Sequence, residues 1–318
     1  MPIYQAIVLA IVQGVTEFLP ISSTAHLWLV PWILKWKDPG LTFDIALHAG
    51  TLVAVLLYFW RYWVEMIKMV LGITEASGSA AVRQPAAAEV GVLTAAHKKR
   101  QLSWPEGSGS LAIPAAEPAK AGAMALVGEN RRLFWYLVIA TIPGGIAGWL
   151  FERAADEKLR SPFIVGPALI IVALLMWAGE RVGSENHNLG QVGLWDSIIV
   201  GVAQAFAVIP GVSRSGSTMT AGLFRNMSRE TAARFSFLLS TPIIAGACFK
   251  KAWEIHHSGL PADMRMPFLL GIIVSAVVGY VVIAALIRYL ERRTFGVFVV
   301  YRIVLGVLIL AVGWGLRH

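Results

Sequence analysis

Glu17, Ser23 and His26 fall within ten residues of one another, in the stretch EFLPISSTAH at positions 17–26, where Ser22 and Thr24 add two further hydroxyls. Ser23 and His26 are three residues apart, so on a helix they share one face. A hydroxyl beside an imidazole is an arrangement that activates a nucleophile. The stretch therefore predicts attack on an anionic electrophile, provided that another part of the chain holds it.

A second polar stretch, PGVSRSGST at positions 210–218, can supply that anion site. The fixed charge of Arg214 stands among hydroxyls and glycines directly before an apolar run. Guanidinium, hydroxyl and helix N-terminal amide donors together match a phosphate best, and glycines permit close backbone approach. The candidate substrate-binding residues beside Arg214 are Gly211, Ser213, Ser215, Gly216 and Thr218, joined from the first stretch by Ser22 and Thr24.

Both stretches lie in a chain whose composition suits a membrane. Of 318 residues, 57% are hydrophobic and 14% are charged, whereas about a quarter are charged in soluble proteins. A helix needs about 20 apolar residues to cross the hydrocarbon. We therefore expect an all-α polytopic membrane protein, in which Arg302 of the last span snorkels toward one end. The six predicted spans are 41–60, 133–151, 163–179, 231–249, 268–287 and 295–316.

The N-terminal stretch, the cysteine count and the net charge exclude several classes of protein and partner. The N-terminal stretch lacks the basic region and the cleavage site of a signal peptide, so we expect it to be retained. Cys248 is the single cysteine, which argues against a disulfide framework or a cysteine metal cluster. The net charge of +8 comes mostly from basic residues that flank the spans, so no nucleic-acid partner is expected. Residues 72–130, rich in Ala, Gly, Pro and Ser, predict an extramembrane linker without a catalytic role.

Two apolar stretches, 3–36 and 195–225, are broken in the middle by proline and small polar residues. An intramembrane ionisable residue at such a break is a functional candidate. We interpret each stretch as a re-entrant helix hairpin; the alternative is a proline-kinked helix that spans fully. Both share an order of glutamine, proline and then hydroxyls, with Gln13 and Pro20 in the first and Gln204 and Pro210 in the second.

This internal similarity suggests a duplicated unit. Each unit would consist of one hairpin followed by three spans, so that residues 1–180 form the first repeat and residues 193–318 the second. An odd number of crossings separates the copies, which makes the repeat inverted. Inverted repeats carry their sites at interrupted helices near the midplane.

At these residues the chain resembles the bacterial undecaprenyl-diphosphate phosphatase family that is named for bacitracin resistance. The first motif of that family, a Glu or Gln followed by a Glu, matches Gln13 and Glu17, and its Ser-Ser-Thr-x-His matches residues 22–26. Its Pro-Gly-x-Ser-Arg-Ser-x-x-Thr motif matches residues 210–218 at every defined position. The resemblance runs from the N-terminus to the last span, and only the linker is longer than the family pattern requires.

The resemblance implies hydrolysis of undecaprenyl diphosphate to undecaprenyl phosphate and inorganic phosphate, which recycles the lipid carrier for cell-wall synthesis. By carry-over, Ser23 is the nucleophile, His26 its base or the leaving-group acid, and Arg214 the phosphate clamp. Glu17 and Gln13 are ligands of a divalent cation, Mg²⁺ or Ca²⁺, or of water. A rival account has His26 or Glu17 activating water directly. A shared phosphate would place Ser23 Oγ and the Arg214 guanidinium within about 8 Å.

Other function classes remain open. An inverted-repeat transporter or flippase for a phosphate-bearing lipid would need Arg214 but no nucleophile. A second class of lipid phosphatases is rejected, because no His-x3-Asp partner follows Ser213 and Arg214. We interpret His48, at the mouth of the first span, as a helix-end or interface residue.

The distribution of basic residues predicts the orientation. The face that bears the linker carries most of the Lys and Arg, and the positive-inside rule puts it in the cytoplasm and both termini outside. We expect the bacterial cytoplasmic (inner) membrane, with the site open to the periplasmic or outer face. The expected partners are undecaprenyl diphosphate and membrane lipids, with a homodimer as an optional assembly.

Overall fold

The computed structural model describes residues 1–73, 131–157, 159 and 161–315, without the side chains of 152–157. Within these residues the chain is helical and forms no β-strand, apart from an isolated bridge between His187 and Met227. The linker predicted at 72–130 lies outside the described residues except for its first two.

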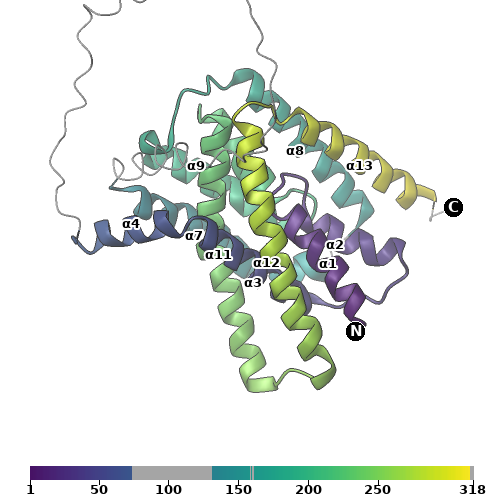
Figure 1. Ribbon diagram of the computed structural model, residues 1–318. Helices are drawn as coiled ribbons and strands as arrows, with labels where there is room; N and C mark the ends of the chain where they lie inside the picture. Colours follow the sequence, from purple (N-terminus) through teal and green to yellow (C-terminus); the bar gives the residue numbers. More distant parts are fainter. Residues whose placement is uncertain (74–130, 158, 160, 316–318) are drawn as a thin grey trace, which may run out of the picture.

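Among the described residues, six helices are long and apolar enough to cross a membrane, which confirms the prediction of an all-α multi-pass protein with six apolar spans. Helices α11 and α12 run side by side (Figure 1), and both extend beyond the apolar stretches predicted for them. The six are α3 (Leu41–Tyr58), α7 (Leu133–Glu157, with the apolar window Leu133–Phe151), α8 (Pro162–Val182), α11 (Arg229–Ser258), α12 (Ala262–Leu290) and α13 (Gly296–Gly315).

Shorter helices flank the two breaks. Helix α1 has 14 residues, which span about 21 Å at 1.5 Å per residue, so it is too short to cross a hydrocarbon core of about 30 Å alone. The first break separates α1 (Ile3–Thr16) from α2 (Ser23–Ile33), and the second separates α9 (Leu194–Ala205) and η2 (Phe206–Val208) from α10 (Arg214–Phe224). Helix α4 (Trp60–Val70) and the turn η1 (Leu189–Gln191) complete the described elements.

The packing of the helices relates the two halves of the chain. Helix α1 packs on α12, and α9 packs on α7. Helix α3 packs on both α11 and α12, while α8 packs on α13, beside which it lies in Figure 1. Gly14 lets α1 approach α12 closely, because a Cβ at this position would lie 2.8 Å from Val278 Cβ. Small residues serve such close helix contacts in membranes.

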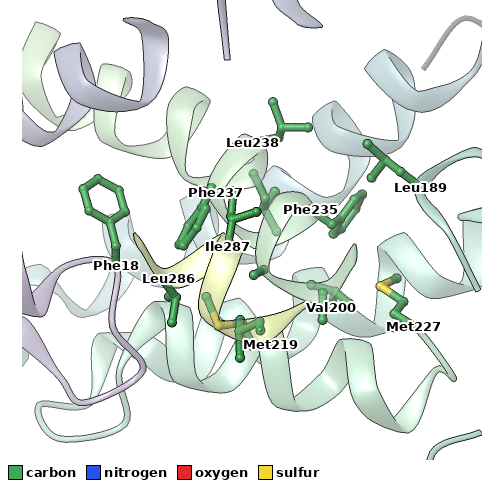
Figure 2. Close-up of a cluster of buried hydrophobic side chains, with 14 of the residues drawn as sticks. Phe18, Leu189, Val200, Met219, Met227, Phe235, Phe237, Leu238, Leu286 and Ile287 are labelled. Carbon is green, nitrogen blue, oxygen red and sulfur yellow. The ribbon is translucent and has the colours of Figure 1, made fainter. Parts of the chain in front are cut away.

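The main hydrophobic core fixes the position of the first break. Phe18 is fully buried and meets Phe237 of α11 edge to face, with ring centroids 5.4 Å apart. Met219 of α10 and Ile287 of α12 belong to the same cluster (Figure 2). Since Phe18 follows Glu17 directly, burial of this ring holds the carboxylate of its neighbour in place.

Arg302 departs from the expectation drawn from its position in the last span. Its side chain does not snorkel: the residue is 0% exposed and lies inside the bundle. The snorkelling prediction was therefore wrong, because hydrogen-bond acceptors deep in the fold outcompete the distant water interface for this guanidinium.

Candidate active site

Both breaks end in a serine whose backbone adopts a left-handed conformation. The φ angles are 76° at Ser22 and 73° at Ser213. Each serine hydroxyl caps the following helix by accepting from the backbone N–H three residues on, at 3.4 Å and 3.1 Å respectively. A positive φ angle is strained for residues other than glycine, and residues with such strained backbones cluster at functional sites. The caps place Ser23 and Arg214 at the first positions of α2 and α10.

The carboxylate of Glu17 joins the two breaks. Ser23 Oγ donates to Glu17 Oε2 at 2.8 Å, and Arg214 Nη2 donates to Glu17 Oε1 at 2.9 Å. Gln13 Nε2 also donates to Oε2, at 3.1 Å, and Glu17 is only 6% exposed. Ser23 and Arg214 therefore occupy the two oxygens of one carboxylate, which agrees with the short separation expected from the sequence.

Helix α11 supports the guanidinium of Arg214 from the other side. Arg214 Nη1 donates to the carbonyl of Ser236 at 3.1 Å. The hydroxyl of Ser236 is hydrogen-bonded to that of Thr218 at 2.7 Å, and Thr218 Oγ1 lies 2.7 Å from the Arg214 carbonyl oxygen. Sequence reasoning missed Ser236, because nothing in its apolar surroundings separates it from an ordinary helix serine.

His26 takes partners other than Ser23. Its Nδ1 lies 2.7 Å from the carbonyl oxygen of Ser22, and its Nε2 lies 2.6 Å from the hydroxyl of Tyr301 on α13. A carbonyl only accepts, so Nδ1 carries the proton and Nε2 accepts from Tyr301. Ser23 instead donates to Glu17, so Glu17 rather than His26 is the hydrogen-bonded base of this hydroxyl.

The other predicted substrate-binding residues build the breaks themselves. Ser215 Oγ donates to the carbonyl of Leu19 at 3.1 Å, so this hydroxyl ties one break to the other. Gly211 has φ +95°, and a Cβ there would lie 2.6 Å from the Val165 carbonyl oxygen. Two hydroxyl pairs complete the turns, Ser22 with Thr24 at 3.1 Å and Ser213 with Ser215 at 3.2 Å.

His48 is a site residue that sequence reasoning placed elsewhere. Its Nε2 lies 3.5 Å from Glu17 Oε2, and its Nδ1 lies 2.7 Å from the Asp44 carbonyl oxygen. The side chain is about a quarter exposed. No local signal points to this contact, because it depends on how α3 and α1 pack together.

Gln13 and Glu17 are the residues expected to hold a divalent cation. No three His, Cys, Asp or Glu side chains form a metal-binding group in the part of the chain that the structure describes. Gln13 and Glu17 are nevertheless adjacent, and Gln13 Oε1 is buried without a hydrogen-bond partner. Amide and carboxylate oxygens are ligands that Mg²⁺ and Ca²⁺ accept, so the pair suits a hard divalent cation by ligand type. The Gln13 amide faces Glu17 with its N–H group, so Oε1 would turn toward the ion when the ion binds.

Comparison with known proteins places the chain in a family. The model of the family described as bacitracin resistance protein BacA matches residues 6–99 and 110–308, which include every site residue from Gln13 to Arg302. The chain belongs to this family. The resemblance carried by the two polar motifs is thereby confirmed. The BacA match covers both breaks, the first five spans and the part of α13 up to residue 308.

Relatives in the BacA family cover nearly the whole chain. The undecaprenyl-diphosphatase of Moorella thermoacetica is 45% identical over 314 residues, which are 99% of each protein. The undecaprenyl-diphosphatase of Pelotomaculum thermopropionicum is 40% identical over 310 residues, which are 98% of this chain and 96% of the relative.

Proposed function

We propose that the chain is a membrane phosphatase that hydrolyses undecaprenyl diphosphate to undecaprenyl phosphate and inorganic phosphate, and so recycles the lipid carrier for cell-wall synthesis. The undecaprenyl-diphosphatases among its relatives support the substrate. The single observation that supports the chemistry is Glu17, whose carboxylate accepts from Ser23 and Arg214 at once. A nucleophile, a base and an anion clamp therefore meet at one point, as phosphoryl transfer requires.

The reaction can proceed through Ser23. Arg214 turns from Glu17 to the terminal phosphate, Glu17 accepts the Ser23 proton, and Oγ forms a bond to phosphorus. The bond from phosphorus to the bridging oxygen breaks, and undecaprenyl phosphate leaves. Water then cleaves the phosphoserine, which releases inorganic phosphate and returns the proton to Ser23.

A one-step alternative uses the same residues. Here Glu17 takes its proton from a water molecule, and that water attacks the phosphorus directly. Ser23 then orients the water or the phosphate instead of bonding to it. His26 is the candidate acid for the leaving group in either route, because it lies one turn of α2 beyond Ser23. Its Nε2 accepts from Tyr301 and carries no proton of its own, so Nε2 must first take up a proton, which it then gives to the leaving oxygen.

A divalent cation, Mg²⁺ or Ca²⁺, is part of this proposal. Gln13 and Glu17 would hold it. Gln13 would contribute Oε1, which is buried without a hydrogen-bond partner, and Glu17 would contribute its neighbouring carboxylate. When bound, the ion neutralises charge on the diphosphate. The residues of the chain still supply the nucleophile, the base and the clamp.

The architecture that we infer is an inverted repeat with two re-entrant hairpins. The cap serines support it, because Gln13 precedes Ser22 by nine residues, as Gln204 precedes Ser213. In the two repeats α1 corresponds to α9 and α12 corresponds to α7. The first hairpin helix of each repeat packs on the second full span of the other, α1 on α12 and α9 on α7. The corresponding spans α3 and α11 pack on each other, as do α8 and α13. Short helices at each break then enter the membrane and return.

The location that we infer is the bacterial cytoplasmic (inner) membrane, with the site open to the periplasmic or outer face. The excess of basic residues on the linker face supports this orientation. A carboxy-terminal phosphatase reporter should be active in cells, and an inactive reporter would reverse the assignment. Undecaprenyl diphosphate and bilayer lipids are the partners. One copy of the chain holds all the residues that the mechanism uses, so a homodimer is not required for the chemistry.

The experiment that tests the function measures phosphate release from undecaprenyl diphosphate by the detergent-purified protein. Ser23→Ala should remove hydrolysis if Ser23 is the nucleophile and should retain part of it if water attacks. A transporter or flippase would release no phosphate in either form. A Ser23→Ala variant that moves lipid as fast as the unmodified chain, while neither hydrolyses it, would replace the phosphatase with that alternative.

A further inference from the structure

Arg302 is a buried cation that binds only carbonyl oxygens. The residue is 0% exposed, and among the described residues no carboxylate forms an ion pair with it. Its hydrogen bonds run to Leu169 O at 3.1 Å, Pro20 O at 3.0 Å, Gly211 O at 2.9 Å and Val212 O at 3.0 Å. Burial of a charge is costly unless its donors are satisfied, so this set of four bonds is what keeps the guanidinium inside.

Three of these carbonyls belong to the breaks. Pro20 lies two residues before the cap serine Ser22, and Gly211 lies two residues before the cap serine Ser213. Arg302 thus bonds the equivalent carbonyl of each break. At membrane depth, carbonyls that leave the helical pattern must find partners within the protein. Arg302 supplies these partners to both breaks from a single planar group.

The Arg302 guanidinium is closed off from the substrate, because the residue is 0% exposed. Arginine has five N–H donors, and four hydrogen bonds to the protein already use most of them. The surroundings are tight as well, since a Cβ added at Gly216 would lie 2.8 Å from Arg302 Nη1. Arg302 can therefore influence the reaction only through the backbone that it holds.

We propose that Arg302 is a positioning residue that sets the distance between Ser23 and Arg214 by fixing both breaks to α13. Its hydrogen bond to Pro20 O fixes the backbone three residues before Ser23. Its bonds to Gly211 O and Val212 O fix the backbone just before Arg214. The consequence for catalysis rests on the proposed phosphatase function. A displacement of about 1 Å between reacting groups can lower a rate by about 100-fold.

Arg302→Lys tests this role in the purified full-length chain. A lysine keeps the charge but cannot reach carbonyls of both breaks in one plane. We expect hydrogen–deuterium exchange to rise selectively in peptides over 17–24 and 209–217, with kcat per folded molecule about 10- to 100-fold lower and KM changed by less than about threefold. Arg234→Lys is the matched control, because this buried arginine bonds Glu230 and Tyr62, away from the breaks, and should leave exchange in both peptides and kcat unchanged.

A second variant covers the case in which Arg302→Lys does not fold. Gly216→Ala keeps Arg302 but crowds Nη1, and it should raise exchange in both breaks to a smaller extent. Unchanged exchange in either break, or a normal kcat in the folded fraction of Arg302→Lys, would overturn the proposal. If the unmodified chain releases no phosphate while exchange responds as expected, the phosphatase function fails and the positioning role of Arg302 stands.

Discussion

Glu17 and Arg214 form an ion pair across the two breaks, with Arg214 Nη2 2.9 Å from Glu17 Oε1. The two residues come from opposite halves of the chain, so only the packed fold brings them together. A phosphate that draws Arg214 toward itself would compete with Glu17 for the same donor. Binding of the substrate is thus coupled to release of the carboxylate that accepts the Ser23 proton.

Glu17→Gln should therefore abolish turnover without unfolding the protein. The amide keeps the shape of the side chain but is not a base, so we expect phosphate release to fall by about 100- to 10,000-fold, the range that general bases contribute. Glu180→Gln is the control, because Glu180 is another poorly exposed glutamate, paired with Arg229, and its loss should affect thermal stability more than kcat. A Glu17→Gln variant that keeps more than a tenth of the activity would exclude Glu17 as the base.

His48 offers a second test of the same carboxylate. Its Nε2 lies 3.5 Å from Glu17 Oε2, and a polar contact at a partly exposed site contributes about 1 kcal/mol, so His48→Ala should lower kcat/KM by about fivefold. His48→Gln retains a donor and should lie closer to the unmodified chain. His257→Ala, at an exposed position near the end of α11, should have no effect. Equal activities of the alanine and unmodified proteins would return His48 to the interface role expected from sequence.

Removal of divalent cations should stop hydrolysis. Excess chelator is expected to abolish phosphate release, and added Mg²⁺ or Ca²⁺ should restore it. Gln13→Leu removes the orphan oxygen beside Glu17 and should raise the cation concentration for half-maximal activity by about tenfold. Glu17→Gln should also sharply raise the cation requirement of any residual activity. Full activity in excess chelator would take the metal out of the mechanism.

The sequence predicts the parts of the fold that depend on local composition. The six spans follow from apolar length. The end of α11 was missed because it continues through the more polar stretch from Trp253 to Ser258. The start of α12 was missed because the helix begins in the more polar stretch from Ala262 to Pro267. A hydroxyl cap at Ser22 or Ser23 follows from the polar residues that precede an apolar helix, and the structure places it at Ser22. The equivalent cap at Ser213 was not predicted. Motif resemblance brought Ser23, Glu17 and Arg214 into one hypothesis.

Contacts between distant segments could not be predicted in this way. His48 and Ser236 reach the site through the packing of α3 and α11, and Tyr301 reaches His26 through α13. Arg302 was expected to snorkel to the membrane–water interface, because its own apolar helix offers no partner for a guanidinium. Its acceptors lie in breaks far away in the chain, and no local pattern reveals that their carbonyls are open.

Close packing of α3 on α12 should control both stability and activity. A Cβ at Gly50 would clash with Ser275 Oγ and with the Ile272 carbonyl oxygen, so Gly50→Ala must push the helices apart. We expect a cost of about 1–3 kcal/mol, as for other overpacked cores, read as a lower melting temperature in detergent. Activity should fall as well, because Gly50 lies two residues after His48 on α3.

The control and a double variant separate this clash from a general effect of alanine. Gly246→Ala on α11 meets nothing within 4 Å and should leave both readouts unchanged. Gly50→Ala combined with Ser275→Gly removes the hydroxyl but not the Ile272 carbonyl, so it should recover only part of the loss. If Gly50→Ala melts at the same temperature as the unmodified chain, α3 does not pack closely on α12 at Gly50, and the position of His48 beside Glu17 loses its support.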